Sequence, residues 1–346
     1  MNTRQRHLMI SGLMASLLTL AGCSQKNEDS TLPVGDSQVA VNSQTEPVTS
    51  VATTSASTSC DGVAPSGELT PIRIEAANTT RTEDGLYEGP VWSNGALYFS
   101  DFTFSEGFPS RIQKLDVAGL MTTVIEDSGS NGLAVDKEGF LIAGTHKYKS
   151  LSRFNPATGE RSSVVEQYNN NVFNSPNDIA IANDGTIYFT DPAFQRDAAP
   201  GGQEKTGVYR VAVDGSVTLV DDTISNPNGI ALSPAGDVLY VNGGGESGLL
   251  RAYPIVDGVP QTGKDLVTGL HIPDGMAVDC KGNIYLTEHI QRRLRVYTPG
   301  GEQIAHAVTD ANLTNVAFGG PDGKTLFLTG AGSVWKIDLA ITGTPY

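Results

Sequence analysis

The hydrophobic and polar positions of the chain repeat six times between residues 88 and 330. Each repeat begins with a polar residue, which we call its head, and continues with a short apolar strand, a glycine-containing turn and a second apolar strand. The heads lie 43, 46, 51, 46 and 40 residues apart: Glu88, Asn131, Asn177, Asn228, Asp274 and Thr314. Two further apolar strands fit between successive repeats, so one period has the length of a four-stranded propeller blade. The pattern predicts an all-β, six-bladed β-propeller.

The last repeat lacks a clear fourth strand. After VWKIDLA no further strand is evident before Tyr346, whereas the apolar segment Leu69 to Ala76 precedes the first repeat and has no other partner. We expect this N-terminal strand to close the ring as the outer strand of blade six, because closure removes an open sheet edge. The predicted propeller domain spans residues 68–346.

The first 67 residues differ from the propeller in composition. Residues 1–22 have the features of a signal peptide, and the apolar run from Leu8 to Leu20 is too short to span a bilayer. The run ends in LAGC, which resembles the bacterial lipobox and implies that Cys23 carries lipid. Residues 23–67 are rich in Ser and Thr and lack aromatic residues, so we expect a flexible tether. The predicted location is the periplasmic or cell-surface face of a bacterial membrane, with the outer membrane favoured by Ser24.

The charge of the chain limits its partners. Asp and Glu number 38 against 23 Lys and Arg, a formal net charge of −15. Removal of the leader, which contains Arg4 and Arg6, makes the net charge −17. Such a polyanion is repelled by phosphate backbones, which argues against nucleic acid and favours cation capture.

The six heads are candidates for a metal site. The innermost strand of each blade lines the propeller axis, so residues at its start converge on one point. All six heads carry oxygen and two are carboxylates, which suits Ca²⁺. None of the heads is Cys or His, which argues against a zinc or copper site at these positions. A single Asn or Asp head is also an ordinary turn residue. Glu88 is a poor turn residue, so the set as a whole favours metal binding.

Several segments resemble the SMP-30/gluconolactonase/LRE family: EGPVW, NSPNDIAI, NPNGIALS, PDGMAVD and AFGGPDGKTLF. The resemblance covers Leu69 to Tyr346 and implies a hydrolase that opens a small lactone. It also implies a single divalent cation, Ca²⁺ with Mg²⁺, Mn²⁺ or Zn²⁺ as substitutes. The ligands carried over by motif are Glu88, Asn177, Asn228 and Asp274.

The expected mechanism combines Lewis-acid activation of the lactone carbonyl with attack by water. Asp274 is the first candidate for the general base, as in the role proposed for the family, and Asp191 is the second. The alternative for Asp274 is that it only binds the metal and that another group acts as the base. Asn131, His146 and His289 are predicted to contact substrate, although a solvated surface position remains the alternative for both histidines.

Other functions remain open at the sequence level. A related Ca²⁺-dependent phosphotriesterase or arylesterase is one alternative, and a propeller that binds a ligand without turnover is another. We expect a monomer whose partners are a small lactone or ester and, through the lipid anchor, the membrane. Two long loops, Phe102 to Ser110 and Pro192 to Thr206, are expected to determine selectivity.

The two remaining cysteines can meet. Cys280 lies in the predicted turn between the first two strands of blade five, on the face opposite the heads. The closing strand begins on that same face, and Cys60 precedes it by about nine residues, which span up to roughly 30 Å. A disulfide between Cys60 and Cys280 and two unpaired thiols both remain open.

Overall fold

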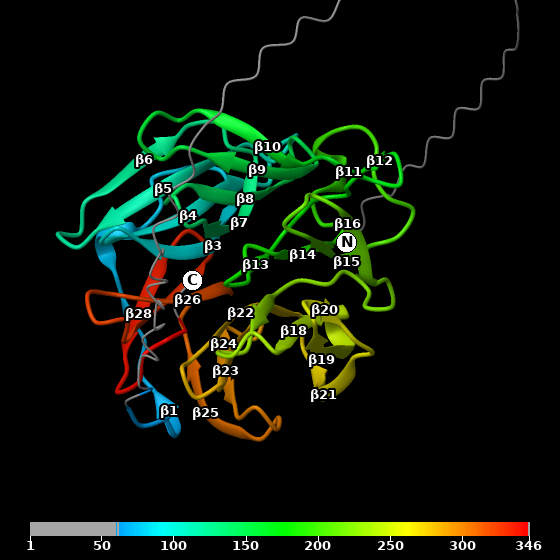
Figure 1. Cartoon of the computed structure of the whole chain (residues 1–346). Helices are drawn as coiled ribbons and strands as arrows, with labels where there is room; N and C mark the ends of the chain where they lie inside the picture. Colours follow the sequence, from blue (N-terminus) through cyan, green and yellow to red (C-terminus); the bar gives the residue numbers. More distant parts are fainter. Residues whose placement is uncertain (1–59, 61, 345–346) are drawn as a thin grey trace, which may run out of the picture. The chain divides into compact units, whose positions relative to one another are not determined.

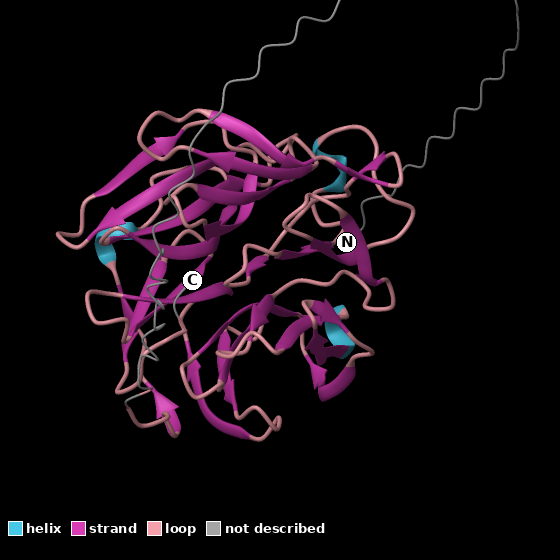
Figure 2. Ribbon diagram, viewed as in Figure 1, coloured by secondary structure: helices cyan, strands magenta, loops and turns pink. Residues whose placement is uncertain are grey.

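The computed structural model describes residues 60 and 62–344. Over these residues six main sheets surround one axis (Figures 1 and 2), and the prediction of a six-bladed propeller is confirmed. The predicted signal peptide, the predicted lipidation site Cys23 and the predicted tether as far as residue 59 lie outside the described residues. No helix in the described part of the chain is long and apolar enough to cross a membrane.

Each blade has four main strands, numbered from the axis outward. Blades one and two contain β3 (Gly85–Ser93), β4 (Ala96–Thr103), β5 (Ser110–Asp116) and β6 (Met121–Ile125), then β7 (Ser130–Val135), β8 (Leu141–Thr145), β9 (Ser150–Phe154) and β10 (Arg161–Val165). Blades three and four contain β13 (Ile179–Ile181), β14 (Ile187–Asp191), β15 (Gly207–Val211) and β16 (Val217–Asp221), then β17 (Ile230–Leu232), β18 (Val238–Gly243), β19 (Gly248–Val256) and β21 (Lys264–Leu270). Blades five and six contain β22 (Pro273–Val278), β23 (Ile284–Glu288), β24 (Arg293–Tyr297) and β25 (Gln303–Val308), then β26 (Leu313–Gly319), β27 (Thr325–Gly330) and β28 (Val334–Asp338).

The connections carry little further structure. A two-stranded ribbon and an extra strand on blade four lie outside the main strands: β11 (Gln167–Tyr168) with β12 (Asn171–Val172), and β20 (Val259–Pro260). Among the described residues the helical elements are short 3-10 turns: η1 (Glu75–Ala77), η2 (Arg196–Ala198) and η3 (Gly245–Ser247).

The hydrophobic core lies between adjacent blades. The inner strands are buried on both faces, so β23 and β27 read as nearly continuous apolar runs. Aromatic side chains fill the interfaces: the rings of Tyr285 in blade five and Phe318 in blade six lie edge to face at 5.0 Å. Trp92 of blade one stacks on Phe327 of blade six at 5.5 Å, which packs the last blade against the first.

An N-terminal segment closes the ring, as predicted, but it contacts two blades. The strand β2 (Ile72–Arg73) pairs antiparallel with β28 and completes blade six. The preceding strand β1 (Gly67–Leu69) pairs in parallel with β25, on blade five. The predicted strand from Leu69 to Ala76 was therefore too long. Pro71 has no backbone N–H to donate to a ladder, so the segment breaks there and crosses from one blade to the next.

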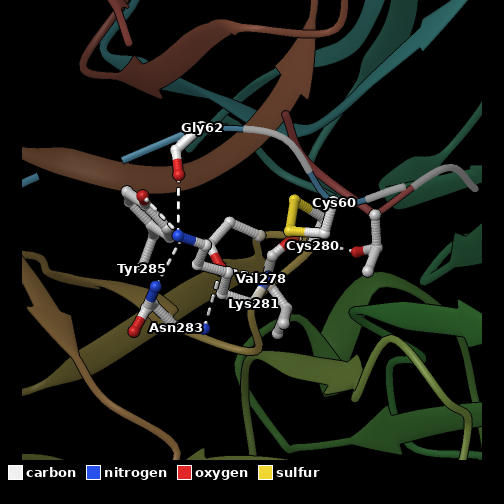
Figure 3. The surroundings of a disulfide bond; sticks show 9 residues. Cys60, Gly62, Val278, Cys280, Lys281, Asn283 and Tyr285 are labelled. Carbon is white, nitrogen blue, oxygen red and sulfur yellow. Dashed lines mark hydrogen bonds between the residues drawn. A yellow bond between two sulfur atoms is a disulfide. The ribbon is translucent and has the colours of Figure 1, made fainter. Parts of the chain in front are cut away.

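A disulfide joins Cys60 to Cys280, so of the two arrangements left open by the sequence the structure contains the bonded one (Figure 3). Cys280 lies in the turn between β22 and β23, and the Nζ of Lys281 next to it donates to the carbonyl of Gly62 at 2.7 Å. The amide of Val63 donates to the carbonyl of Ala340 at 3.2 Å. Residue 60 and residues 62–67, which the sequence assigned to the tether, thus contact the propeller.

Candidate metal centre

The six heads stand at the start of the innermost strands and are deeply buried. Glu88, Asn131 and Asp274 lie in β3, β7 and β22, while Asn177 and Asn228 come directly before β13 and β17. None of these five side chains belongs to a residue more than 6% exposed. The sixth head, Thr314, donates its hydroxyl hydrogen to the carbonyl of Tyr87 and so links blade six to blade one.

A side chain in the second strand of one blade holds the head of the next blade by its backbone. Four such bonds share a length of 2.6 Å: Ser100 Oγ to the carbonyl of Asn131, Thr190 Oγ1 to Asn228, Asn242 Nδ2 to Asp274, and Thr287 Oγ1 to Thr314. At the third blade, the amide of Gly132 donates to the carbonyl of Asn177 at 3.2 Å instead. The position of each head is therefore fixed by its neighbour. Sequence reasoning missed these residues, although the small polar residue late in each second strand was a readable signal.

Three buried carboxylates influence one another at this end of the axis. Burial and the charge of Asp178 raise the pKa of Glu88 to about 8. Burial raises the pKa of Asp178 to about 7, and burial with the charges of Glu88 and Asp178 raises the pKa of Asp274 well above its ordinary value. Asp178 is not a head and was missed in the sequence, where it follows Asn177. Such mutual repulsion is relieved when a cation binds between the groups.

Four oxygens at the heads have no hydrogen-bond partner among the described residues. They are Oδ1 of Asn131, Asn177, Asn228 and Asp274, and each is buried. A buried unpaired oxygen is costly, and most buried polar atoms in folded proteins are paired. Amide and carboxylate oxygens converging on one axis suit a hard cation such as Ca²⁺. Across residues 60 and 62–344, no group of three or more His, Cys, Asp and Glu is arranged to hold a metal, so amide oxygens must contribute to any such site.

His289 lies beside Asp274. Its Nδ1 donates to the carbonyl of Leu313 at 2.7 Å and is 3.5 Å from Oδ2 of Asp274. Burial lowers the pKa of His289, which favours the neutral ring. With the proton on Nδ1, the Nε2 atom of the neutral ring is an acceptor.

Asp191, the second candidate for the base, faces the backbone of a loop. It is fully buried, and its two oxygens accept hydrogen bonds from the amides of Asn174 and Ser175, each at 2.8 Å. This loop leads into Asn177. Glu288 in blade five does the same, because its Oε1 accepts from the amide of His271, three residues before Asp274. The geometry therefore favours a structural role for Asp191, in which it holds the loop that leads into Asn177, over a role as general base.

The remaining predicted substrate residues contact the two long loops. Nε2 of His146 donates to the carbonyl of Phe108 at 2.8 Å, and burial lowers the pKa of His146 to about 4, which keeps the ring neutral. Nδ2 of Asn131 lies 3.4 Å from Oε1 of Gln195, in the loop that follows β14. One loop thus reaches a head, Asn131, and the other reaches His146, but no hydrogen bond in the described part of the chain joins His146 to a head side chain.

Comparison with known proteins agrees with the fold. A family model described as the SMP-30/Gluconolactonase/LRE-like region matches residues 86–332. A gluconolactonase of Zymomonas mobilis is 29% identical over 296 residues, which cover 78% of this chain and 81% of that protein.

Two solved structures are also similar. A gluconolactonase from Xanthomonas campestris superimposes with a TM-score of 0.67 at 27% identity, and the match covers 80% of this chain and 99% of that one. Regucalcin from Agrobacterium tumefaciens, described as a calcium-binding protein, has a TM-score of 0.66 at 22% identity, with coverage of 81% and 97%. At that identity the second likeness concerns the fold alone.

Proposed function

Since this chain belongs to the SMP-30/gluconolactonase/LRE family, we propose that it is a hydrolase that opens a small lactone with the help of a divalent cation, Ca²⁺ in the first instance. The relatives named gluconolactonase support the substrate class. The calcium-binding regucalcin, similar in fold, is compatible with the choice of cation.

The observation that carries the proposal is the set of partnerless buried oxygens at the heads. Three of these oxygens belong to Asn177, Asn228 and Asp274, which would hold the cation together with the buried carboxylate of Glu88. Two carboxylates and two amides suit oxygen-binding ions. When bound, the cation supplies Lewis-acid polarisation of the lactone carbonyl.

The chain's own residues would perform the proton transfer and exclude water. Asp274 would orient a water molecule and take its proton. The Nε2 atom of His289, whose Nδ1 lies 3.5 Å from Oδ2 of Asp274, would accept a hydrogen bond from substrate or water. Asn131 presents a buried amide oxygen that can accept a hydrogen bond from a substrate hydroxyl. The loops that follow β4 and β14 are placed to limit access of bulk water.

The test is a hydrolysis assay on sugar lactones, with an aryl ester and a phosphotriester as competing substrates. Activity on the lactone should disappear in EDTA and return with Ca²⁺. Asp274→Asn should lower kcat by about 100-fold to 1000-fold, the usual loss when an oxyanion-stabilising arrangement is disrupted. Circular dichroism of the same samples checks that the variant is folded. Full activity in EDTA would contradict the cation role, and turnover of the phosphotriester alone would contradict the substrate class.

We also propose that the chain is held at a bacterial membrane through a lipid on Cys23, on the basis of the LAGC motif alone. Membrane fractionation of the natural chain and of Cys23→Ser tests this proposal. The natural chain should sediment with membranes and the variant should not; equal distribution of the two would contradict the anchor.

A further inference from the structure

The residue that follows each head forms a second ring around the axis. It is glycine in four blades and carries a polar side chain in the other two: Gly89, Gly132, Gly229 and Gly275, then Asp178 and Asn315. A Cβ on Gly275 would lie 1.9 Å from the side chain of Asn315, and a Cβ on Gly132 would lie 2.7 Å from Oδ1 of Asp178. Gly132 and Gly275 therefore leave space that the side chains of Asp178 and Asn315 fill.

Asn315 connects two of the buried carboxylates. Its Nδ2 donates to Oδ1 of Asp178 at 2.9 Å and lies 3.5 Å from Oε2 of Glu88. Its Oδ1 accepts from the backbone amide of Val316 at 2.8 Å. Because the oxygen is held by an N–H donor, the amide has one favourable orientation, with both of its hydrogens available to the carboxylates. Residues of blades one, three and six are thereby linked across the axis.

The pair also separates the heads from a cavity. A cavity of about 120 Å³ runs along the innermost strands from the turns of the opposite face. Apolar side chains such as Ile179, Ile230 and Met276 line it, and Asp178 and Asn315 lie at its inner end. None of the six heads lines this cavity.

We propose that Asp178 and Asn315 are a positioning pair that forms the floor of the cation site and holds the Glu88 carboxylate in place for ligation. The inference rests on the proposed function, because it assigns a role around the same cation. Second-sphere hydrogen bonds orient metal ligands, and their loss typically costs 10-fold to 100-fold in metal affinity. Asn315 makes such a bond to Glu88 and is itself fixed by Asp178.

Calorimetric titration of EDTA-treated, dialysed protein with Ca²⁺ tests the pair without an activity assay. Asn315→Ala and Asp178→Ala should each raise the Ca²⁺ dissociation constant by about 10-fold to 100-fold. The double variant should lose less than the product of the two single losses, because coupled residues are not additive. If Asn315→Ala does not fold, Asn315→Ser tests the same bridge, since its side chain is too short to reach both carboxylates.

Asn283 provides a matched control. Its Nδ2 donates to Oδ2 of Asp279 at 2.8 Å, in the turn of blade five on the opposite face, so it forms a buried pair of the same kind. Asn283→Ala should lower the melting temperature and leave the Ca²⁺ affinity unchanged. Unchanged affinity in both Asn315 variants, or an equal loss in Asn283→Ala, would overturn the positioning role alone. A natural chain that binds no Ca²⁺ would overturn the cation site and this role together.

Discussion

Three carboxylates with raised pKa values share the head end of the axis, and they make the stability of the metal-free protein depend on pH. The ordinary pKa values are 4.5 for Glu and 3.8 for Asp, and the folded-state values are about 8 for Glu88 and about 7 for Asp178. The folded protein therefore binds more protons than the unfolded chain between about pH 4 and pH 8. Stability contributed by these groups falls as the pH rises through that window.

We expect the melting temperature in EDTA to fall between pH 5.5 and pH 8.5, and Ca²⁺ to reduce the fall because a bound cation favours the ionised carboxylates. Calcium at 100 times its dissociation constant should add about 2.7 kcal/mol to the free energy of unfolding. Scanning calorimetry at both pH values, with and without Ca²⁺, measures the effect. Glu88→Gln should flatten the slope; a slope unchanged in that variant would show that other groups cause it.

A substitution of Asp191 can distinguish a structural role of this residue from a catalytic one. Asp191→Asn keeps the side-chain volume but replaces one acceptor by an NH₂ group, which leaves the amide of Asn174 or Ser175 buried without a partner. We expect a loss of about 1 to 3 kcal/mol in the free energy of unfolding, together with weaker Ca²⁺ binding through the displaced Asn177 loop. Urea denaturation and Ca²⁺ titration measure the two effects.

The exposed Asp197, in the loop that follows β14, serves as the control, because Asp197→Asn should change neither quantity. A general base would behave differently, with kcat reduced about 100-fold to 10,000-fold at unchanged stability and Ca²⁺ affinity. That pattern in Asp191→Asn would restore Asp191 as a catalytic residue.

At the scale of elements, the short N-terminal strands decide whether the ring is closed. A chain that begins at Asn78 lacks both β1 and β2, so β28 is left as an open edge and β25 loses its parallel partner. We expect it to melt without a single cooperative transition and to aggregate. A chain that begins at Gly67 keeps both strands but, among the described contacts, loses the Cys60–Cys280 disulfide and the hydrogen bonds of Gly62 and Val63. It should therefore melt cooperatively at a lower temperature than the full chain.

Calorimetry and light scattering of the two shortened chains and the full chain provide the comparison. Equal, cooperative melting of all three would mean that packing such as that of Trp92 on Phe327 suffices to close the ring.

The elements also show how far the sequence could be interpreted. The period of the heads predicted six blades because the alternation of apolar runs and turns is local, and it placed the six buried, oxygen-bearing heads at one end of the axis. The sequence did not predict that the closing segment divides at Pro71, because the division depends on which strand edge each half meets: β25 for β1 and β28 for β2. Asp178 looks like a turn residue in the sequence, since its partner Asn315 is 137 residues away in another blade. Asp191 was a candidate base because it is a carboxylate at the end of a second strand. Its carboxylate instead accepts hydrogen bonds from backbone amides, which no sequence pattern displays.

At the scale of the whole molecule, the disulfide links parts of the chain that are 220 residues apart. A cross-link around so long a loop contributes about 3 to 5 kcal/mol in the chain-entropy model. Cys280→Ser should therefore lower the free energy of unfolding by about this amount, as measured by urea denaturation. Thiol titration of denatured, unreduced protein should find Cys60 and Cys280 unreactive. Two reactive thiols at these positions would contradict the bond.

The closing segment also sets the order in which the protein can be completed during synthesis. Residues 60 to 73 leave the ribosome long before their partners: β2 precedes β28 by more than 250 residues. At roughly 5 to 20 residues per second, this interval lasts on the order of 10 to 60 seconds. During most of it the segment has no partner in the translated chain, and five blades can assemble while the sixth consists only of its outer strand, β2. The last step of ring formation therefore falls after nearly the whole chain has been translated, which gives a chaperone or a translocation machine time to act on an unclosed ring.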